Sequence, residues 1–189
     1  MSAQELHEDI DEVLITADEI GDKAAQLGKQ ITEDYRGKDV LLVGVLKGAF
    51  MFMSDLAREV QLPIEFDFMA VSSYGSATKS SGVVRILKDL DYEISERHVL
   101  LVEDIIDSGL TISYLLRYLE ARRPASLEIC SLLWKKGEQA VPLEVRYPGF
   151  EIPPRFVVGY GLDYAEKYRN LPYIGVLKPS AYGAEGSPE

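Results

Sequence analysis

Cysteine and histidine are both scarce in this chain of 189 residues. The single cysteine, Cys130, excludes an intrachain disulfide, and its place in the apolar segment 127–134 predicts a small core residue. The two histidines, His7 and His98, are too few and too far apart to indicate a zinc site or a Ser-His catalytic triad. Such sparse cysteine usage fits a reducing compartment, and we expect the protein to be cytoplasmic.

Positive charge and long apolar segments are also in short supply. There are 31 acidic against 20 basic residues, which gives a formal net charge of −11. An acidic chain is poorly suited to nucleic acid or anionic membranes, so we expect neither as a partner. No apolar run approaches about eighteen residues and no basic, apolar leader follows Met1. We therefore expect no membrane span and no signal peptide.

The most informative stretch joins a buried strand to a helix. It opens with the apolar run 99–102, which is typical of a strand buried on both faces. Two acids, Glu103 and Asp104, follow, and after Ile105 and Ile106 comes the polar segment 107–111. After Gly109, apolar residues recur with helical spacing, at Leu110, Tyr114, Leu115, Tyr118 and Leu119.

This junction is suited to a phosphorylated sugar. The first turn of a helix exposes unpaired N–H groups and binds anions, and Gly109 allows close backbone approach. The acids upstream would repel a phosphate but suit ribose hydroxyls or Mg²⁺. The alternative is an ordinary strand–turn–helix in which Asp107 and Ser108 cap the helix. That alternative explains Asp107 and Ser108 but not the adjacent pair Glu103 and Asp104.

The stretch resembles the phosphoribosyl pyrophosphate (PRPP) motif of type I phosphoribosyltransferases. The resemblance implies that Glu103 and Asp104 position the ribose hydroxyls, partly through Mg²⁺. It implies that Asp107 is the general acid or base at purine N7. The residues expected to contact PRPP form one continuous segment: Glu103, Asp104, Ile105, Ile106, Asp107, Ser108, Gly109, Leu110 and Thr111.

Two further segments match this family in order. The apolar segment 40–46 predicts a strand, and the Lys47-Gly48 pair that ends it resembles the family's pyrophosphate loop, with Arg169 as a second pyrophosphate ligand. The alternative is that Lys47 is a solvated lysine and Gly48 a glycine needed for packing. The sequence does not determine whether the peptide bond at Lys47-Gly48 is cis. Segment 72–82, which includes Ser73 and Tyr74, resembles the mobile catalytic lid; the alternative is a solvated hairpin loop.

Alternating strands and helices predict an α/β fold with a mostly parallel sheet in one domain, 1–189. The resemblance adds a small hood formed by terminal segments. We expect an irregular segment over 138–154 and a disordered tail after about residue 180. The remaining expected elements are strands at 10–15, 64–68, 83–87, 126–133, 156–160 and 173–177, a helix from a capping box at 16–19 to about 35, and a helix from 50.

The second half of the chain resembles the hypoxanthine-guanine branch of the family. The resemblance implies that Lys135 donates to purine O6, that Phe156 stacks on the ring, and that the backbone at Val157 and Asp163 reads the remaining edge. The Asp163 side chain would help to hold a second Mg²⁺. The implied substrates and products are PRPP, hypoxanthine, guanine, IMP, GMP and pyrophosphate, and the family usually forms homodimers or homotetramers. Two other readings stay open: a regulator that senses PRPP or a nucleotide, and a transferase for a pyrimidine or xanthine.

Overall fold

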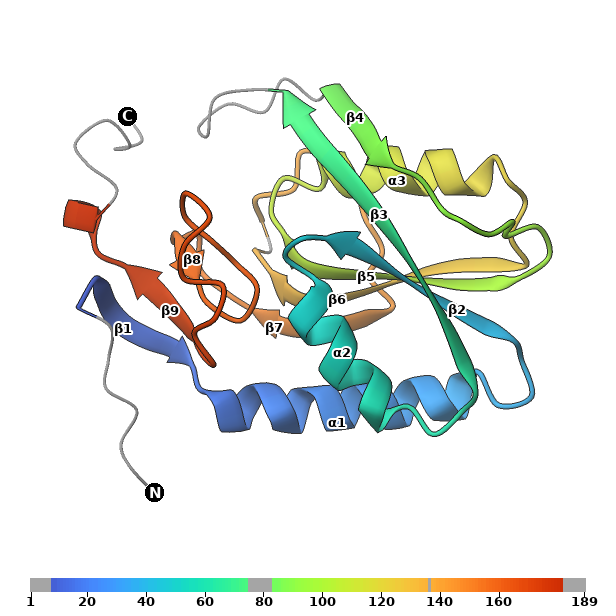
Figure 1. Cartoon of the computed structure of the whole chain (residues 1–189), viewed down its shortest axis with the longest axis horizontal. Helices are drawn as coiled ribbons and strands as arrows, with labels where there is room; N and C mark the ends of the chain where they lie inside the picture. Colours follow the sequence, from blue (N-terminus) through green and yellow to red (C-terminus); the bar gives the residue numbers. More distant parts are fainter. Residues whose placement is uncertain (1–7, 75–82, 136, 182–189) are drawn as a thin grey trace.

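The computed structural model describes residues 8–74, 83–135 and 137–181, and its centre is a six-stranded sheet (Figure 1). Every neighbouring pair is parallel except the β3–β4 pair. The prediction of a mostly parallel α/β sheet is therefore confirmed. In spatial order the strands are β4 (Val83–Lys88), β3 (Ile64–Tyr74), β2 (Val40–Leu46), β5 (His98–Ile106), β6 (Ser126–Trp134) and β7 (Tyr147–Glu151).

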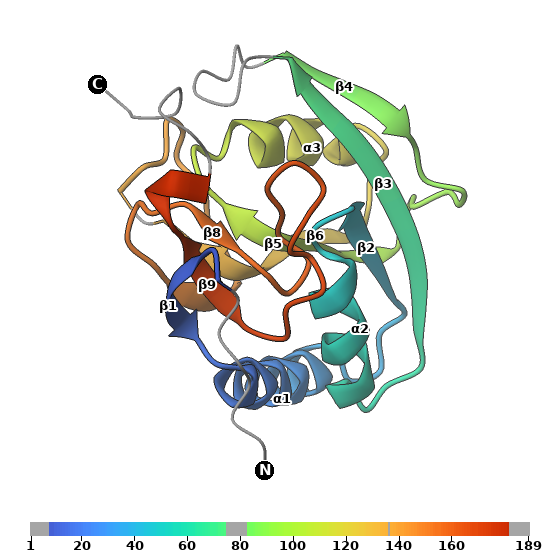
Figure 2. The same ribbon diagram turned by 60° about the vertical axis from the view of Figure 1, so that its left-hand side comes forward.

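Helices cover both faces of this sheet, which explains the continuous apolar runs of its central strands (Figure 2). Alternate residues of β2 point into two separate cores: Leu42 packs with α1 (Ala17–Asp34) and α2 (Phe50–Glu59), and Leu41 packs with α3 (Leu110–Glu120). Cys130 is buried in the first core, as predicted, and burial raises the pKa of its thiol. Within the described ranges no helix is long and apolar enough to cross a membrane.

A smaller antiparallel sheet joins the two ends of the described chain. Its order is β1 (Ile10–Ile15), β9 (Ile174–Leu177) and β8 (Val157–Val158). It lies beside the main sheet near the end where β5 and β2 finish (Figure 2). This is the hood expected from terminal segments. After β9, Pro179–Ala181 forms a short 3₁₀ helix, so the chain is still ordered at the point where we expected the tail to begin; residues 182–189 lie outside the described part.

Two strands extend beyond their predicted ends. Strand β5 continues through the acidic pair to Ile106, because its parallel pairing with β6 runs as far as Trp134. Glu103 and Asp104 are therefore within the strand, not after it. Strand β3 continues to Tyr74, since its last residues pair with β4 as far as Val83. The first residues of the expected lid segment are thus a strand, and 75–82 lies outside the described residues.

Segment 138–154 was expected to be irregular, but it contains strand β7. Gly149 lies so close to β6 that an added Cβ would be 2.2 Å from the Leu132 carbonyl oxygen. The fully buried Tyr147 anchors the strand in the core. Because β7 is an edge strand, it tolerates Pro148, whose missing N–H misled the sequence reading. In the opposite sense, the predicted strand 156–160 is reduced to the two residues of β8.

Helix α1 begins at the predicted capping box and crosses α2 at a glycine. The Thr16 hydroxyl accepts from the Glu19 N–H, and the Glu19 carboxylate accepts from the Thr16 N–H at 2.8 Å. Gly28 lies on the buried stripe, where an added Cβ would be 2.4 Å from Cβ of Glu59. Gly21, in the same helix, is exposed and has nothing within 4 Å of an added Cβ.

These two glycines predict opposite effects of the same substitution. Gly21→Ala should raise the free energy of unfolding by about 0.5–1 kcal/mol, because alanine favours helix. Gly28→Ala should lower it by about 1–3 kcal/mol, because α2 leaves no room for the methyl group. Urea unfolding followed by circular dichroism measures both. If both variants were stabilised, the close helix crossing would be wrong.

Candidate active site

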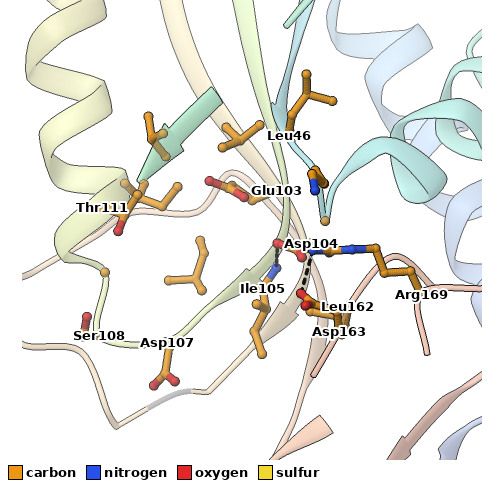
Figure 3. Close-up of a pocket in the computed structure, with 17 residues that line it drawn as sticks. Leu46, Glu103, Asp104, Ile105, Asp107, Ser108, Thr111, Leu162, Asp163 and Arg169 are labelled. Atoms are coloured by element: carbon orange, nitrogen blue, oxygen red, sulfur yellow. Dashed lines mark hydrogen bonds and ion pairs between the residues drawn. The ribbon is translucent and has the colours of Figure 1, made fainter. Parts of the chain in front are cut away.

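A cavity of about 470 Å³ opens where β2 and β5 end, and the loop that leads from β8 to β9 lines one side of it with Asp163 and Arg169 (Figure 3). Its volume lies within the range of about 300–1,000 Å³ typical of small-molecule sites. The place is also typical, since ligands of open α/β sheets bind beyond the carboxyl ends of the strands. Of the residues singled out in the sequence, the cavity wall includes Lys47, Gly48, Glu103, Asp104, Ile105, Ile106, Asp107, Ser108, Gly109, Thr111, Asp163 and Arg169.

The first wall is the open N-terminus of α3. Gly109 is the N-cap, with a φ of 77°, and among the described residues no side chain caps the helix. Asp107 and Ser108 therefore do not have the capping role considered as an alternative: Asp107 pairs with Lys135 instead. The first N–H groups of α3 are left available for an anion, as at other helix N-termini that bind phosphate. Leu110 begins this helix and does not line the cavity.

The second wall is the acidic pair at the end of β5, in which Glu103 is buried and Asp104 is half-buried. Glu103 is only 6% exposed, and desolvation, followed by the charge of Asp104, raises its pKa well above the usual value. Burial likewise raises the pKa of Asp104 to about 6, although its Oδ1 accepts from the Ile105 N–H at 2.8 Å. Burial disfavours the charged form of a carboxyl group and therefore costs stability. A pair of poorly solvated carboxyls in a cavity is for this reason typical of a functional site.

The third wall is the loop after β2, which is pressed between Asp104 and the hood. An added Cβ on Gly48 would lie 1.6 Å from Asp104 Oδ2. On the other side, Gly161 has a φ of 100°, and an added Cβ there would lie 2.1 Å from the Gly48 carbonyl oxygen. Gly161 therefore requires glycine, and a side chain at Gly48 would have to displace the Asp104 carboxylate. The cis peptide bond in this loop joins Leu46 to Lys47, one bond before the Lys47-Gly48 bond.

The fourth wall is the loop 159–169, which carries Arg169. The Arg169 guanidinium donates to the Gly161 carbonyl at 2.7 Å and pairs with Asp163 at 2.8 Å (Figure 3). Glu166, which the sequence reading missed, pairs with Lys47 at 2.9 Å. The two residues are 119 positions apart, and the sequence carries no signal for this contact.

Of the residues expected to bind the purine, Asp163 lines this cavity, whereas Lys135, Phe156 and Val157 lie beside it. Lys135 Nζ is 2.9 Å from Asp107 Oδ2, so the cavity and the Lys135 side chain share one carboxylate. The Gln139 amide, also missed from sequence, donates to the Lys135 carbonyl at 2.7 Å. Phe156 is 43% exposed and meets Tyr164 edge-on, with ring centroids 5.7 Å apart. Val157 is buried in the hood, and the backbone of Ser73 and Tyr74 lies at the end of β3.

The acids of the site fit a metal ion only in part. No group of three or more His, Cys, Asp or Glu side chains gathers within 8–74, 83–135 and 137–181. Glu103 and Asp104 supply a pair, and Asp163 is engaged by Arg169 and by the Glu166 N–H. Mg²⁺ commonly takes one or two carboxylates and completes its shell with substrate phosphates and water. This donor set therefore fits Mg²⁺ that arrives with a phosphorylated ligand.

Known proteins are similar to this chain in both sequence and fold. Residues 14–165 match the phosphoribosyl transferase domain. The chain is 56% identical to the hypoxanthine-guanine phosphoribosyltransferase of Mycobacterium avium over 180 residues, 92% of this chain and 89% of that protein. It is 52% identical to the enzyme of that name from Bacillus subtilis over 174 residues, 92% of this chain and 97% of that protein. The solved hypoxanthine phosphoribosyltransferase from Staphylococcus aureus matches with a TM-score of 0.92 at 46% identity, covering 97% of this chain and all of that one. This chain therefore belongs to the phosphoribosyltransferase family and has its type I fold.

Proposed function

We propose that this protein transfers the 5-phosphoribosyl group of PRPP to N9 of hypoxanthine or guanine, releasing pyrophosphate and giving IMP or GMP. One observation carries the proposal: a single cavity combines an open helix N-terminus, a pair of poorly solvated acids and two cations, Lys47 and Arg169. These are the groups that a 5′-phosphate, ribose hydroxyls and a pyrophosphate require. The names of the similar proteins support purine salvage as the setting.

The proposed binding mode divides PRPP among the walls of the cavity. The backbone N–H groups of 108–111, including that of Leu110, hold the 5′-phosphate, with hydroxyl donors from Ser108 and Thr111. Glu103 and Asp104 accept from the ribose hydroxyls. Lys47, Gly48 and Arg169 hold the pyrophosphate and stabilise the negative charge that it gains as it leaves.

Mg²⁺ is the proposed cofactor, held by Glu103 and Asp104 and, at a second position, by Asp163. When bound, it offsets the charge of the pyrophosphate. Each Asp163 oxygen already accepts one hydrogen bond or ion pair but keeps a further acceptor position. The protein's own contribution is to hold these carboxylates in a poorly solvated place, where they attract a cation strongly.

The purine is proposed to bind between Lys135 and Asp107. O6 and N7 are adjacent acceptors on one edge of a 6-oxopurine. The ammonium of Lys135 donates to O6, and Asp107 acts as general acid or base at N7. In the ligand-free protein these two side chains neutralise each other at 2.9 Å. Phe156 stacks on the ring, and the backbone of Val157 and Asp163 reads the opposite edge.

We further propose that the protein is a single-domain cytoplasmic enzyme that works as a homodimer or homotetramer, with segment 72–82 as its lid. Two exposed aromatic side chains, Phe50 and Phe66, border a groove between α2 and β3, which supports self-association.

A regulator that only senses PRPP is the second candidate. The presence of both Asp107 and Lys135, which phosphate binding does not need, favours the enzyme.

Liquid chromatography of a reaction containing PRPP, Mg²⁺ and one base tests the proposal. Hypoxanthine and guanine should give IMP and GMP with equal amounts of pyrophosphate, and EDTA should stop both reactions. Product from xanthine or uracil but not from hypoxanthine would support a different transferase. Tight PRPP binding without any nucleotide product would support the regulator.

Asp104→Asn should stabilise the ligand-free protein while it weakens PRPP binding. The folded pKa of about 6 lies above the unfolded value of about 3.9, so the folded state binds more protons between these pH values. The free energy of unfolding therefore falls as pH rises from about 4 to 6, and the amide removes this loss. At pH 7.5 the melting temperature should rise by roughly 2–4 °C, the change that about 1 kcal/mol gives in a chain of this size.

Calorimetry with Mg²⁺ and PRPP gives the other half of the Asp104→Asn test. The variant should bind PRPP at least about tenfold more weakly, as expected for the loss of a charge-assisted contact. Asp22→Asn removes an exposed acid of α1 and should change neither quantity. A variant with lower thermal stability and normal PRPP affinity would show that Asp104 is a structural residue.

Lys135→Ala should impair base binding much more than PRPP binding. An ammonium has donors only, so it suits the O6 acceptor and opposes the amino group of adenine. The wild type should therefore reject adenine by about 10⁴–10⁵ in kcat/KM. Loss of one charge-assisted hydrogen bond should raise KM for hypoxanthine about ten- to a hundredfold. Lys29→Ala, on the exposed face of α1, is the control, and an equal rise in both KM values would refute the O6 assignment.

A further inference from the structure

Both cations of the proposed pyrophosphate site already contact an anion of the protein. Glu166 Oε2 lies 2.9 Å from Lys47 Nζ and 3.5 Å from an Arg169 guanidinium nitrogen. Hydrogen bonding to Lys47 lowers the pKa of Glu166, so the carboxylate is ionised at neutral pH. Glu166 therefore contacts the same two cations that would hold a pyrophosphate, from a position just outside the cavity wall.

A tight turn presents Glu166 to these cations. Tyr164 and Lys167 exchange backbone hydrogen bonds of 3.2 and 3.0 Å across the turn. Between them, Ala165 and Glu166 have φ values of 51° and 65°, a backbone region that L residues rarely adopt. The Glu166 N–H donates to Asp163 at 2.9 Å, which fixes the turn on the same aspartate that pairs with Arg169. The position of Glu166 thus follows from the backbone as well as from its charge.

The contact between Lys47 and Glu166 is easily exchanged for a stronger one. Both side chains are about two-thirds exposed, at 65% and 64%, so solvent and salt screen their attraction. A pyrophosphate carries several negative charges and more acceptor oxygens than one carboxylate. To displace Glu166 it has to break only this exposed contact and the longer one, of 3.5 Å, with Arg169.

We propose that Glu166 is an internal competitor for the pyrophosphate subsite, which lowers the affinity for pyrophosphate and so favours its release. The inference rests on the proposed function, because it takes Lys47 and Arg169 as pyrophosphate ligands. Glu166 contacts these cations in a fraction of the protein molecules, and those molecules cannot bind a ligand that needs the same cations. The apparent affinity for such a ligand is reduced by that fraction. A ligand that uses only the α3 N-terminus and Lys135 is unaffected.

Calorimetric titration of magnesium pyrophosphate into the full chain tests this role. Glu166→Gln removes the charge and should tighten pyrophosphate binding about two- to fivefold, the range expected for an exposed ion pair. Glu166→Asn, whose side chain tolerates the left-handed backbone, should do the same. IMP affinity should stay unchanged in both variants. Glu33→Gln, an exposed acid of α1 that does not line the cavity, controls for the change in net charge.

The outcomes separate this inference from the proposed function. A wild type that binds IMP but not pyrophosphate would overturn both. A wild type that binds pyrophosphate, with Glu166→Gln and Glu166→Asn equal to it or weaker, would overturn the role of Glu166 alone. Equal tightening of pyrophosphate and IMP would show a general change in the site, and would also refute competition.

Discussion

The candidate site depends on a close approach of three chain segments at Gly48. On one side of this glycine lies the Asp104 carboxylate of β5, and on the other lies Gly161 of the loop after β8. Neither side leaves room for a Cβ, so the loop after β2 is held between the sheet and the hood. Because of this packing, Lys47, the acidic pair and Arg169 surround one cavity although they come from distant parts of the chain.

The site also carries charged groups that make the fold less stable. Burial raises the pKa values of Glu103 and Asp104, so ionising them costs folding free energy. The cations are placed differently: Lys47 pairs with Glu166, and Arg169 pairs with Asp163. The two acids are thus suited to bind a cation or hydroxyl donors, whereas the two cations already pair with carboxylates of the protein. This asymmetry suits a ligand with a ribose at one end and a pyrophosphate at the other.

The sequence revealed the parts of the site that lie within one local element. The run 99–111 combines a buried strand, two acids and a helix start, and each leaves a residue pattern that is readable without a structure. Strand β7 was missed because the prolines of segment 138–154, Pro148 among them, suggest a loop, while the edge position that permits Pro148 is a tertiary feature. Glu166 was missed for a similar reason. Its partner Lys47 is 119 residues away, and its left-handed backbone occurs at a residue type that does not predict it.

Titration of Mg²⁺ and PRPP into a Gly48→Ala variant tests whether the close approach at Gly48 positions the ligand-binding groups. The added methyl group would fall on the place of the Asp104 carboxylate and force it to move. We expect a folded protein, shown by circular dichroism, that binds PRPP at least about tenfold more weakly than wild type, as for a lost charge-assisted contact. A folded Gly48→Ala variant with wild-type affinity for PRPP would contradict this expectation.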